Sequence, residues 1–199
     1  AGAPPAAGGS ARPHAAVAGP ARAAAGEPVA TGPFDLTVRS WSVTAAEQGS
    51  SLEDSGADAG RVVVVGALDT DRESRRLDRT AVTLPDELPG GLALAGDAEP
   101  DRPDPTLLVR DASSYPVLSP GLADDVALLW PVSVPGESGA VSTPDEPLTV
   151  TVPTFRYRDM TVGGGRRWAE TGAVTRVGVP AGAVPPASGA PPVAGGGGG

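Results

Sequence analysis

Between residues 34 and 179 the chain consists of short β-branched or alternating runs, separated by clusters of Gly, Pro and Asp. No segment keeps a 3.6-residue apolar period over a helix-like length. Evenly spaced short runs with turn residues between them are typical of all-β proteins, so the pattern predicts an antiparallel β-sandwich of about seven strands. The expected strands are residues 34–44, 62–69, 79–84, 106–111, 125–130, 148–158 and 173–179.

Two of these runs predict more detail. Alternation over residues 148–152 indicates a strand with one face in the core and one face in water. The apolar phase of the first run changes near Val38, which favours a β-bulge or a strand buried on both faces. Trp41 and Trp130 lie in apolar runs, and we expect both to be core residues.

The two ends of the chain have a different composition. Residues 1–33 include 25 Gly, Pro or Ala residues, and residues 180–199 include 17. Such segments have too little apolar side-chain surface to offset the entropy lost on ordering, so both are expected to be disordered. The predicted organisation is a Pro/Ala/Gly-rich spacer (1–33), the sandwich (34–179) and a Pro/Gly-rich tail (180–199). A remnant of cloning or processing is the alternative explanation of residues 1–33.

The residues that most enzymes rely on are nearly missing. The chain has no Cys, and its one His, His14, lies in the N-terminal spacer. Thiol nucleophiles, thiolate metal sites and His-based triads are therefore excluded from the predicted domain. We expect no enzymatic activity and no cofactor. No run approaches the ~18 apolar residues of a membrane-spanning helix, and no signal peptide is visible.

The charges of the predicted domain are unevenly distributed. Residues 34–153 carry 21 acids and 8 Arg, whereas residues 154–179 carry 2 acids and 5 Arg. The predicted final hairpin is therefore a basic edge on an acidic body. The candidate partner-binding residues in it are Arg156, Arg158, Arg166, Arg167 and Trp168. Ion pairing of these arginines with the acidic body is the competing interpretation, and nucleic acid is not an expected partner because the chain is acidic overall.

Two long insertions, residues 45–60 and 85–105, interrupt the strands, and loops of this length are usually functional or disordered. The second carries four candidate metal ligands: Asp97, Glu99, Asp101 and Asp104. Dense carboxylates suit Ca²⁺, which takes 6 to 8 oxygen ligands. Prolines within the segment restrict their convergence, and a solubilising charged loop is the other interpretation.

The order of these parts resembles a known family. Residues 61–71 (RVVVVGALDTD) look like the second strand of Ig-like extracellular domains of unknown function, and 115–121 (YPVLSPG) resemble their "Leu-x-Pro-Gly" turn. An apolar strand that ends near "Val-Pro" follows at 126–135, and a further strand follows at 148–152. Such domains occur in lipoproteins and membrane-anchored proteins of Gram-positive, notably actinobacterial, bacteria. The resemblance implies an Ig-like sandwich outside the cytoplasmic membrane, and implies no catalytic residues.

Together these observations lead to one expectation about function. We expect a non-enzymatic, extracytoplasmic binding or accessory module of the cell envelope, either secreted or anchored. Its long loops and basic hairpin would contact a protein or a cell-wall glycan. The alternative is a structural subunit of an envelope assembly, joined through its tails.

Overall fold

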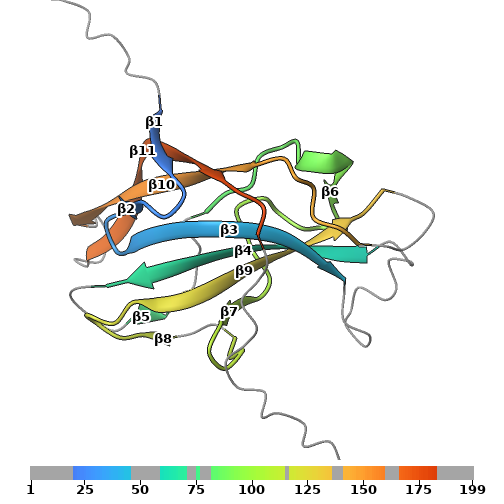
Figure 1. Ribbon diagram of the computed structural model, residues 1–199. Coiled ribbons are helices and arrows are strands. Elements are labelled where there is room, and N and C mark those ends of the chain that lie inside the picture. The colour runs from blue at the N-terminus through green and yellow to red at the C-terminus, as the bar shows by residue number, and fades with distance from the viewer. Residues whose placement is uncertain are drawn as a thin grey trace, which may run out of the picture.

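The computed structural model describes residues 20–45, 59–70, 75–76, 82–114, 117–135, 141–159 and 166–182. This part of the chain is all-β: it contains eleven strands and a single 3-10 turn, η2 (Pro89–Gly91), and no α-helix (Figure 1). The strands are β1 (Ala21–Ala24), β2 (Pro28–Ala30), β3 (Asp35–Ala45), β4 (Ala59–Asp69), β5 (Arg75–Arg76), β6 (Ala93–Leu94), β7 (Thr106–Leu108), β8 (Val117–Leu118), β9 (Asp124–Ser133), β10 (Leu148–Asp159) and β11 (Arg166–Val179).

The larger sheet is built around three long antiparallel strands. Its order is β2-β3-β4-β9-β6, and β7 also pairs with β9. All of its pairings are antiparallel, and the sheet curls like half a barrel. β4 lies at its centre because Val62–Val65 are four consecutive β-branched residues, which suit a strand buried on both faces.

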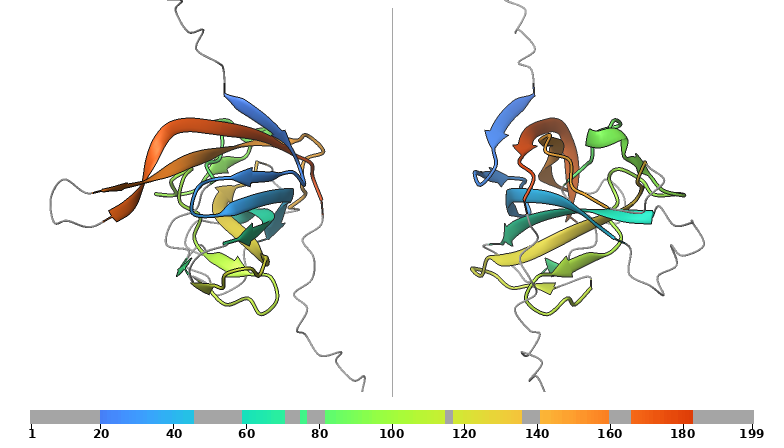
Figure 2. Two further views of the ribbon diagram at one scale, coloured as in Figure 1. Left: turned by 90° about the vertical axis from the view of Figure 1, so that its left-hand side faces the viewer. Right: turned by 45° about the vertical axis from the view of Figure 1, so that its right-hand side comes forward.

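The smaller sheet lies across the larger one and has the order β1-β11-β10 (Figure 2). β10 and β11 pair antiparallel along nearly their whole length. β1 pairs with β11 in parallel, with Ala21 opposite Thr175 and Ala24 opposite Gly178. A separate short pair joins β5 to β8.

The main core lies between the two sheets. Side chains of β3, β4 and β9 meet side chains of β10 and β11 in one cluster of buried residues. Trp41 and Trp130 are both fully buried there, as predicted. In β10 the predicted alternation is confirmed, because Leu148, Val150 and Val152 are fully buried while Thr149 is exposed.

The predicted irregularity near Val38 is a β-bulge. The register of β3 against β4 shifts between Val38 and Ser40, with Val38 opposite Gly66 and Ser40 opposite Val65. The extra residue lets Leu36 and Val38 point into the main core together with Trp41 and Val43 beyond the shift. Arg39, at the bulge, donates a 2.8 Å hydrogen bond to Asp125 on β9.

The centre of the larger sheet is buried on its outer face as well. Val63, Val65, Ala127 and Leu129 form a second buried cluster, with Leu107 and Val109 packed against it. The four valines of β4 therefore supply side chains to both clusters, which explains why this run shows no alternation of polar and apolar residues.

The sheets extend beyond the predicted domain limits at both ends. β1 and β2 lie inside the segment assigned to the spacer, and Val29 of β2 is buried in the core. At the other end, Trp41 donates a 3.1 Å hydrogen bond to Pro180, and Gly182 donates one of 2.9 Å to Trp41. The rest of both predicted tails, residues 1–19 and 183–199, lies outside the described residues.

Other expectations are met in part. The predicted strand at 106–111 is only three residues long in β7, and the described part of the one at 79–84 forms a single bridge, from Thr83 to Thr151. Most of the first insertion lies outside the described residues, as does His14. Within the described ranges, no helix is long and apolar enough to cross a membrane.

Candidate functional site

The hairpin of β10 and β11 projects beyond the rest of the molecule (Figure 2). In this projecting part, residues 155–159 pair with residues 166–170, and neither segment pairs with a third strand among those described. We refer to these two segments as the arm. It contains all five of the residues that the sequence predicts for partner binding.

A bulge separates the arm from the rest of the smaller sheet. The register between β10 and β11 shifts between Pro153 and Phe155. Thr171 fastens the bulge, because its hydroxyl donates a 3.0 Å hydrogen bond to the Thr154 carbonyl and accepts one of 3.1 Å from Ala173 N–H. Gly172 has a φ of 78°, which glycine adopts at little cost. A bulge bends and twists a strand, so it sets the arm's direction.

Strand alternation divides the predicted residues between two faces of the arm. Arg158 pairs with Arg167, and Arg156 pairs with Ala169, so the three arginines share one face. Tyr157 pairs with Trp168, which puts both rings on the opposite face. The backbone of Arg166 pairs with Asp159. The expected mixed surface of arginine and tryptophan is thus a basic face with an aromatic face behind it.

The aromatic face attaches the arm to the body. The rings of Tyr157 and Trp168 have their centroids 5.3 Å apart at an interplanar angle of 51°. Tyr157 is 49% exposed, whereas Trp168 is partly buried against the loop that contains Gly32. Phe155 N–H donates a 2.6 Å hydrogen bond to the carbonyl of Thr31 in that loop. Trp168 therefore has a structural role in addition to any part in binding.

The basic face has no acidic partner within the described part of the chain. Arg156, Arg158 and Arg167 are exposed, and none of them forms an ion pair there. The ion pairs seen among the described residues of the body involve other arginines: Arg39 with Asp125, Arg102 with Glu99, and Arg110 with Asp111 and Asp124. Among the described residues, these three arginines therefore form no ion pair with the acidic body, contrary to the competing interpretation.

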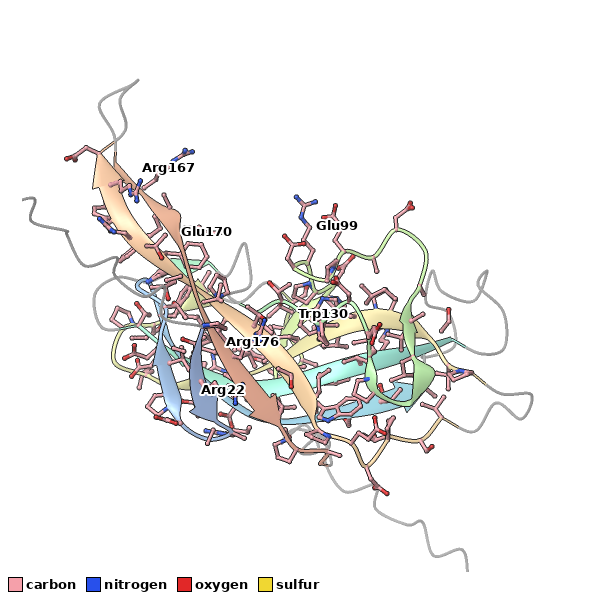
Figure 3. All side chains as sticks on the ribbon, turned by 90° about the horizontal axis from the view of Figure 1, so that it is seen from above. Arg22, Glu99, Trp130, Arg167, Glu170 and Arg176 are labelled. Atoms are coloured by element: carbon pink, nitrogen blue, oxygen red, sulfur yellow. The ribbon has the colours of Figure 1, made fainter. Side chains whose placement is uncertain are left out.

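A second pair of like charges lies on the same sheet. Arg22 of β1 is opposite Arg176 of β11, and Figure 3 labels both residues on these neighbouring strands. Neither forms an ion pair among the described residues. The sequence could not reveal this pairing, because Arg22 lies in a segment that was assigned to the spacer.

The candidate metal ligands lie on a folded loop between β6 and β7. Glu99 pairs with Arg102 at 2.8 Å, and Asp104 N–H donates a 2.7 Å hydrogen bond to the Leu129 carbonyl. Asp97 and Asp101 are exposed on the same loop. Across the described ranges, no three acidic or histidine side chains come together in a group that could hold a metal ion. These four carboxylates are therefore neighbours in sequence that do not converge on one point.

Another acidic surface lies where two loops touch. A Cβ at Gly90 would stand 2.5 Å from Cγ of Pro144, so the loop before β6 packs directly on the loop before β10. Each loop carries an adjacent pair of exposed carboxylates. The four residues of this acidic end are Asp86, Glu87, Asp145 and Glu146. None forms an ion pair in the described structure.

One carboxylate has a clearly shifted pKa. Asp111 accepts hydrogen bonds from the hydroxyl of Ser113 at 2.7 Å and from its backbone N–H at 3.0 Å. These bonds favour the ionised form and lower the pKa of Asp111 below its ordinary value, with a smaller contribution from Arg110. Since the side chain lies in a surface turn after β7, the shift reflects turn structure and gives no sign of catalysis.

Comparison with known proteins adds no assignment. Neither a protein-family model, nor a curated protein, nor a solved structure matches this chain. The chain's own geometry singles out the arm. Its basic face offers guanidinium groups, which bind carboxylates and phosphates through paired N–H donors.

Proposed function

We propose that this chain is a non-enzymatic binding or accessory module of the cell envelope, located outside the cytoplasmic membrane, with an Ig-like sandwich as its scaffold. The arm is its contact surface, and the partner is an anionic protein or cell-wall glycan. The observation that carries the proposal is the exposed basic face of Arg156, Arg158 and Arg167, which has no counter-charge among the described residues.

The like-charge pairing on the arm supports a binding role. Arginines directly opposite each other on neighbouring strands repel and destabilise the pair. Arg158 and Arg167 are opposite each other on a hairpin where strand propensity alone would favour β-branched or aromatic residues. A partner that supplies carboxylates or phosphates would relieve this repulsion.

The rest of the molecule supports a scaffold for such a contact. The arm continues two strands of a packed core, and Trp168 and Phe155 fix its base against the loop at Gly32. Binding residues on a rigid strand lose less conformational entropy on association than residues on a flexible loop. The sequence of the described sheets contains no Cys or His to serve as nucleophile or base, which favours binding over catalysis.

The test is cosedimentation of the full chain with purified actinobacterial envelope fragments, using wild type and the triple variant R156Q/R158Q/R167Q. The triple variant R22Q/R102Q/R176Q is the matched control, since it removes the same charge from other sites. We expect the arm variant to bind roughly tenfold more weakly, and the control to bind within about twofold of wild type.

Fragments treated with protease separate a protein partner from a glycan, because only the glycan survives the treatment. Equal weakening in both triple variants would mean that binding follows net charge and not the arm, and would contradict the proposal. Absence of binding by the wild-type chain to either preparation would contradict it as well.

A further inference from the structure

The acidic end and the arm lie at opposite ends of one strand. Asp145 and Glu146 immediately precede β10, which begins at Leu148, and the arm contains its other end at Asp159. Eleven steps at ~3.3 Å place the two ends about 35 Å apart. The arm therefore cannot reach the acidic end of its own molecule.

The basic face of the arm and the acidic end are complementary in charge, and both are exposed. The basic face presents three arginines, and the acidic end presents four carboxylates in two adjacent pairs. All seven side chains are exposed, and none forms an ion pair in the part of the chain that the structure describes. Each surface thus carries the counter-charges that the other surface lacks.

A second copy of this chain satisfies both surfaces at once. When two copies lie antiparallel with both surfaces on the contact side, the ~35 Å between arm and acidic end is the same in each, and the arm of either copy can meet the acidic end of the other. Such an arrangement is a two-fold pair, in which the contact between arm and acidic end occurs twice and the assembly closes.

We propose that two copies of this chain associate antiparallel, with Arg156, Arg158 and Arg167 of each arm bound to Asp86, Glu87, Asp145 and Glu146 of the other copy. This inference rests on the proposed function in taking the arm as the contact surface, and the second copy competes with the envelope partner for the same basic face. The contact is electrostatic, so it weakens as salt is added.

The test is analytical ultracentrifugation of the full chain at low ionic strength and at about 0.5 M salt, where charges beyond a few ångströms are screened. Three samples are compared: wild type, the arm variant R156Q/R158Q/R167Q, and the acidic-end variant D86N/E87Q/D145N/E146Q. We expect wild type to form dimers at low salt and to dissociate roughly tenfold more readily at high salt. Each variant alone should be monomeric.

An equimolar mixture of the two variants is the decisive sample. The intact acidic end of the arm variant can receive the intact arm of the other variant, so the mixture should form heterodimers that neither variant forms with itself. Recovery in the mixture also shows that both variants are folded. Because a heterodimer keeps one of the two contacts, it should be weaker than the wild-type dimer. A mixture that associates no more strongly than either variant alone, at concentrations well above those at which wild type dimerises, would overturn the proposed contact.

Other outcomes bear on the two proposals separately. A monomeric wild type at low salt, or species larger than a dimer, overturns the antiparallel pair. If the wild type is monomeric but the arm variant still loses envelope binding, the proposed function stands and self-association falls. Association that appears only when nucleic acid is added would also overturn the inference, since it would identify a different anion.

Discussion

At the scale of single residues, the turn after β7 shows how hydrogen bonds to one carboxylate stabilise an unfavourable backbone conformation. Ala112 has a φ of 55°, the only non-glycine residue with a positive φ in the described part of the chain. Its neighbours fix that conformation: Asp111 accepts two hydrogen bonds from Ser113, and Leu108 N–H donates one of 3.0 Å to the Ser113 carbonyl. The left-handed region costs an alanine roughly 1–2 kcal/mol.

Ala112→Gly is expected to stabilise the protein, because glycine adopts a positive φ without that cost. The greater freedom of glycine in the unfolded chain offsets about 0.5–1 kcal/mol of the gain. A net increase of about 0.5–1 kcal/mol corresponds to a rise of roughly 1–4 °C in Tm. Ala93→Gly in the extended strand β6 is the control and should lower Tm. A lower Tm for Ala112→Gly would contradict the strain assigned to this turn.

At the scale of elements, the arm depends on one glycine of another strand connection. Gly32 has a φ of 111°, and a Cβ there would lie 2.8 Å from Cζ3 of Trp168 and would collide with the carbonyl oxygen of Phe155. The base of the arm thus packs on bare backbone. Any side chain at position 32 would push the arm away from the body.

Gly32→Ala should therefore destabilise the protein by more than the cost of placing alanine at a positive φ. Gly26→Ala is the matched control, since Gly26 also has a positive φ, 83°, but no atom lies within 4 Å of a Cβ built there. We expect about 1–2 kcal/mol of lost unfolding free energy for the control and at least about 1 kcal/mol more for Gly32→Ala. Urea denaturation measures both values. Equal losses would show that the arm does not pack on residue 32.

At the scale of the whole molecule, the two ends of the described chain complete the sheets. β2 pairs with the start of β3, and residues 180–182 pair with Trp41 on the same edge, beyond the bulge. Thr31 is fully buried and its carbonyl accepts the hydrogen bond from Phe155. Together these segments cover an edge strand that would otherwise expose unpaired backbone groups.

A chain limited to residues 34–179 should consequently be less stable than one spanning residues 20–182. The shorter chain loses the burial of Val29, worth about 1.5–3 kcal/mol, and several backbone hydrogen bonds worth about 1 kcal/mol each. Thermal melts of the two truncated chains measure the difference, and the 34–179 chain should unfold at a clearly lower temperature. Equal melting temperatures would mean that the outer strands contribute nothing.

The accuracy of the sequence predictions followed how local each signal is. The alternation of residues 148–152 and the phase change at Val38 are properties of single strands, and both are confirmed. The sequence missed β1, since Ala-Arg-Ala-Ala has no apolar pattern and its residues are mostly exposed, so backbone pairing with β11 defines it.

The candidate site shows the same difference between local signals, which the sequence carries, and non-local contacts, which it does not. Composition was sufficient to single out the arginines near the final hairpin, and strand alternation could have separated Tyr157 and Trp168 from Arg156, Arg158 and Arg167. The absence of a counter-charge for these three within the described residues could not be predicted, because it depends on how the bulge directs the arm relative to distant loops. The contact between Gly90 and Pro144, which brings the two acidic loops together, is equally non-local.

The parallel pairing of β1 with β11 also has a mechanical consequence. The chain enters the sheet at the start of β1 and leaves it at the end of β11, and these two strands run in the same direction. Tension between the two ends would therefore slide β1 along β11, loading their hydrogen bonds together in shear instead of opening them one at a time. The bridge between Trp41 and Ala181 would have to break first. After that, the β1–β11 pair would be loaded in shear, which resists force better than opening hydrogen bonds one at a time.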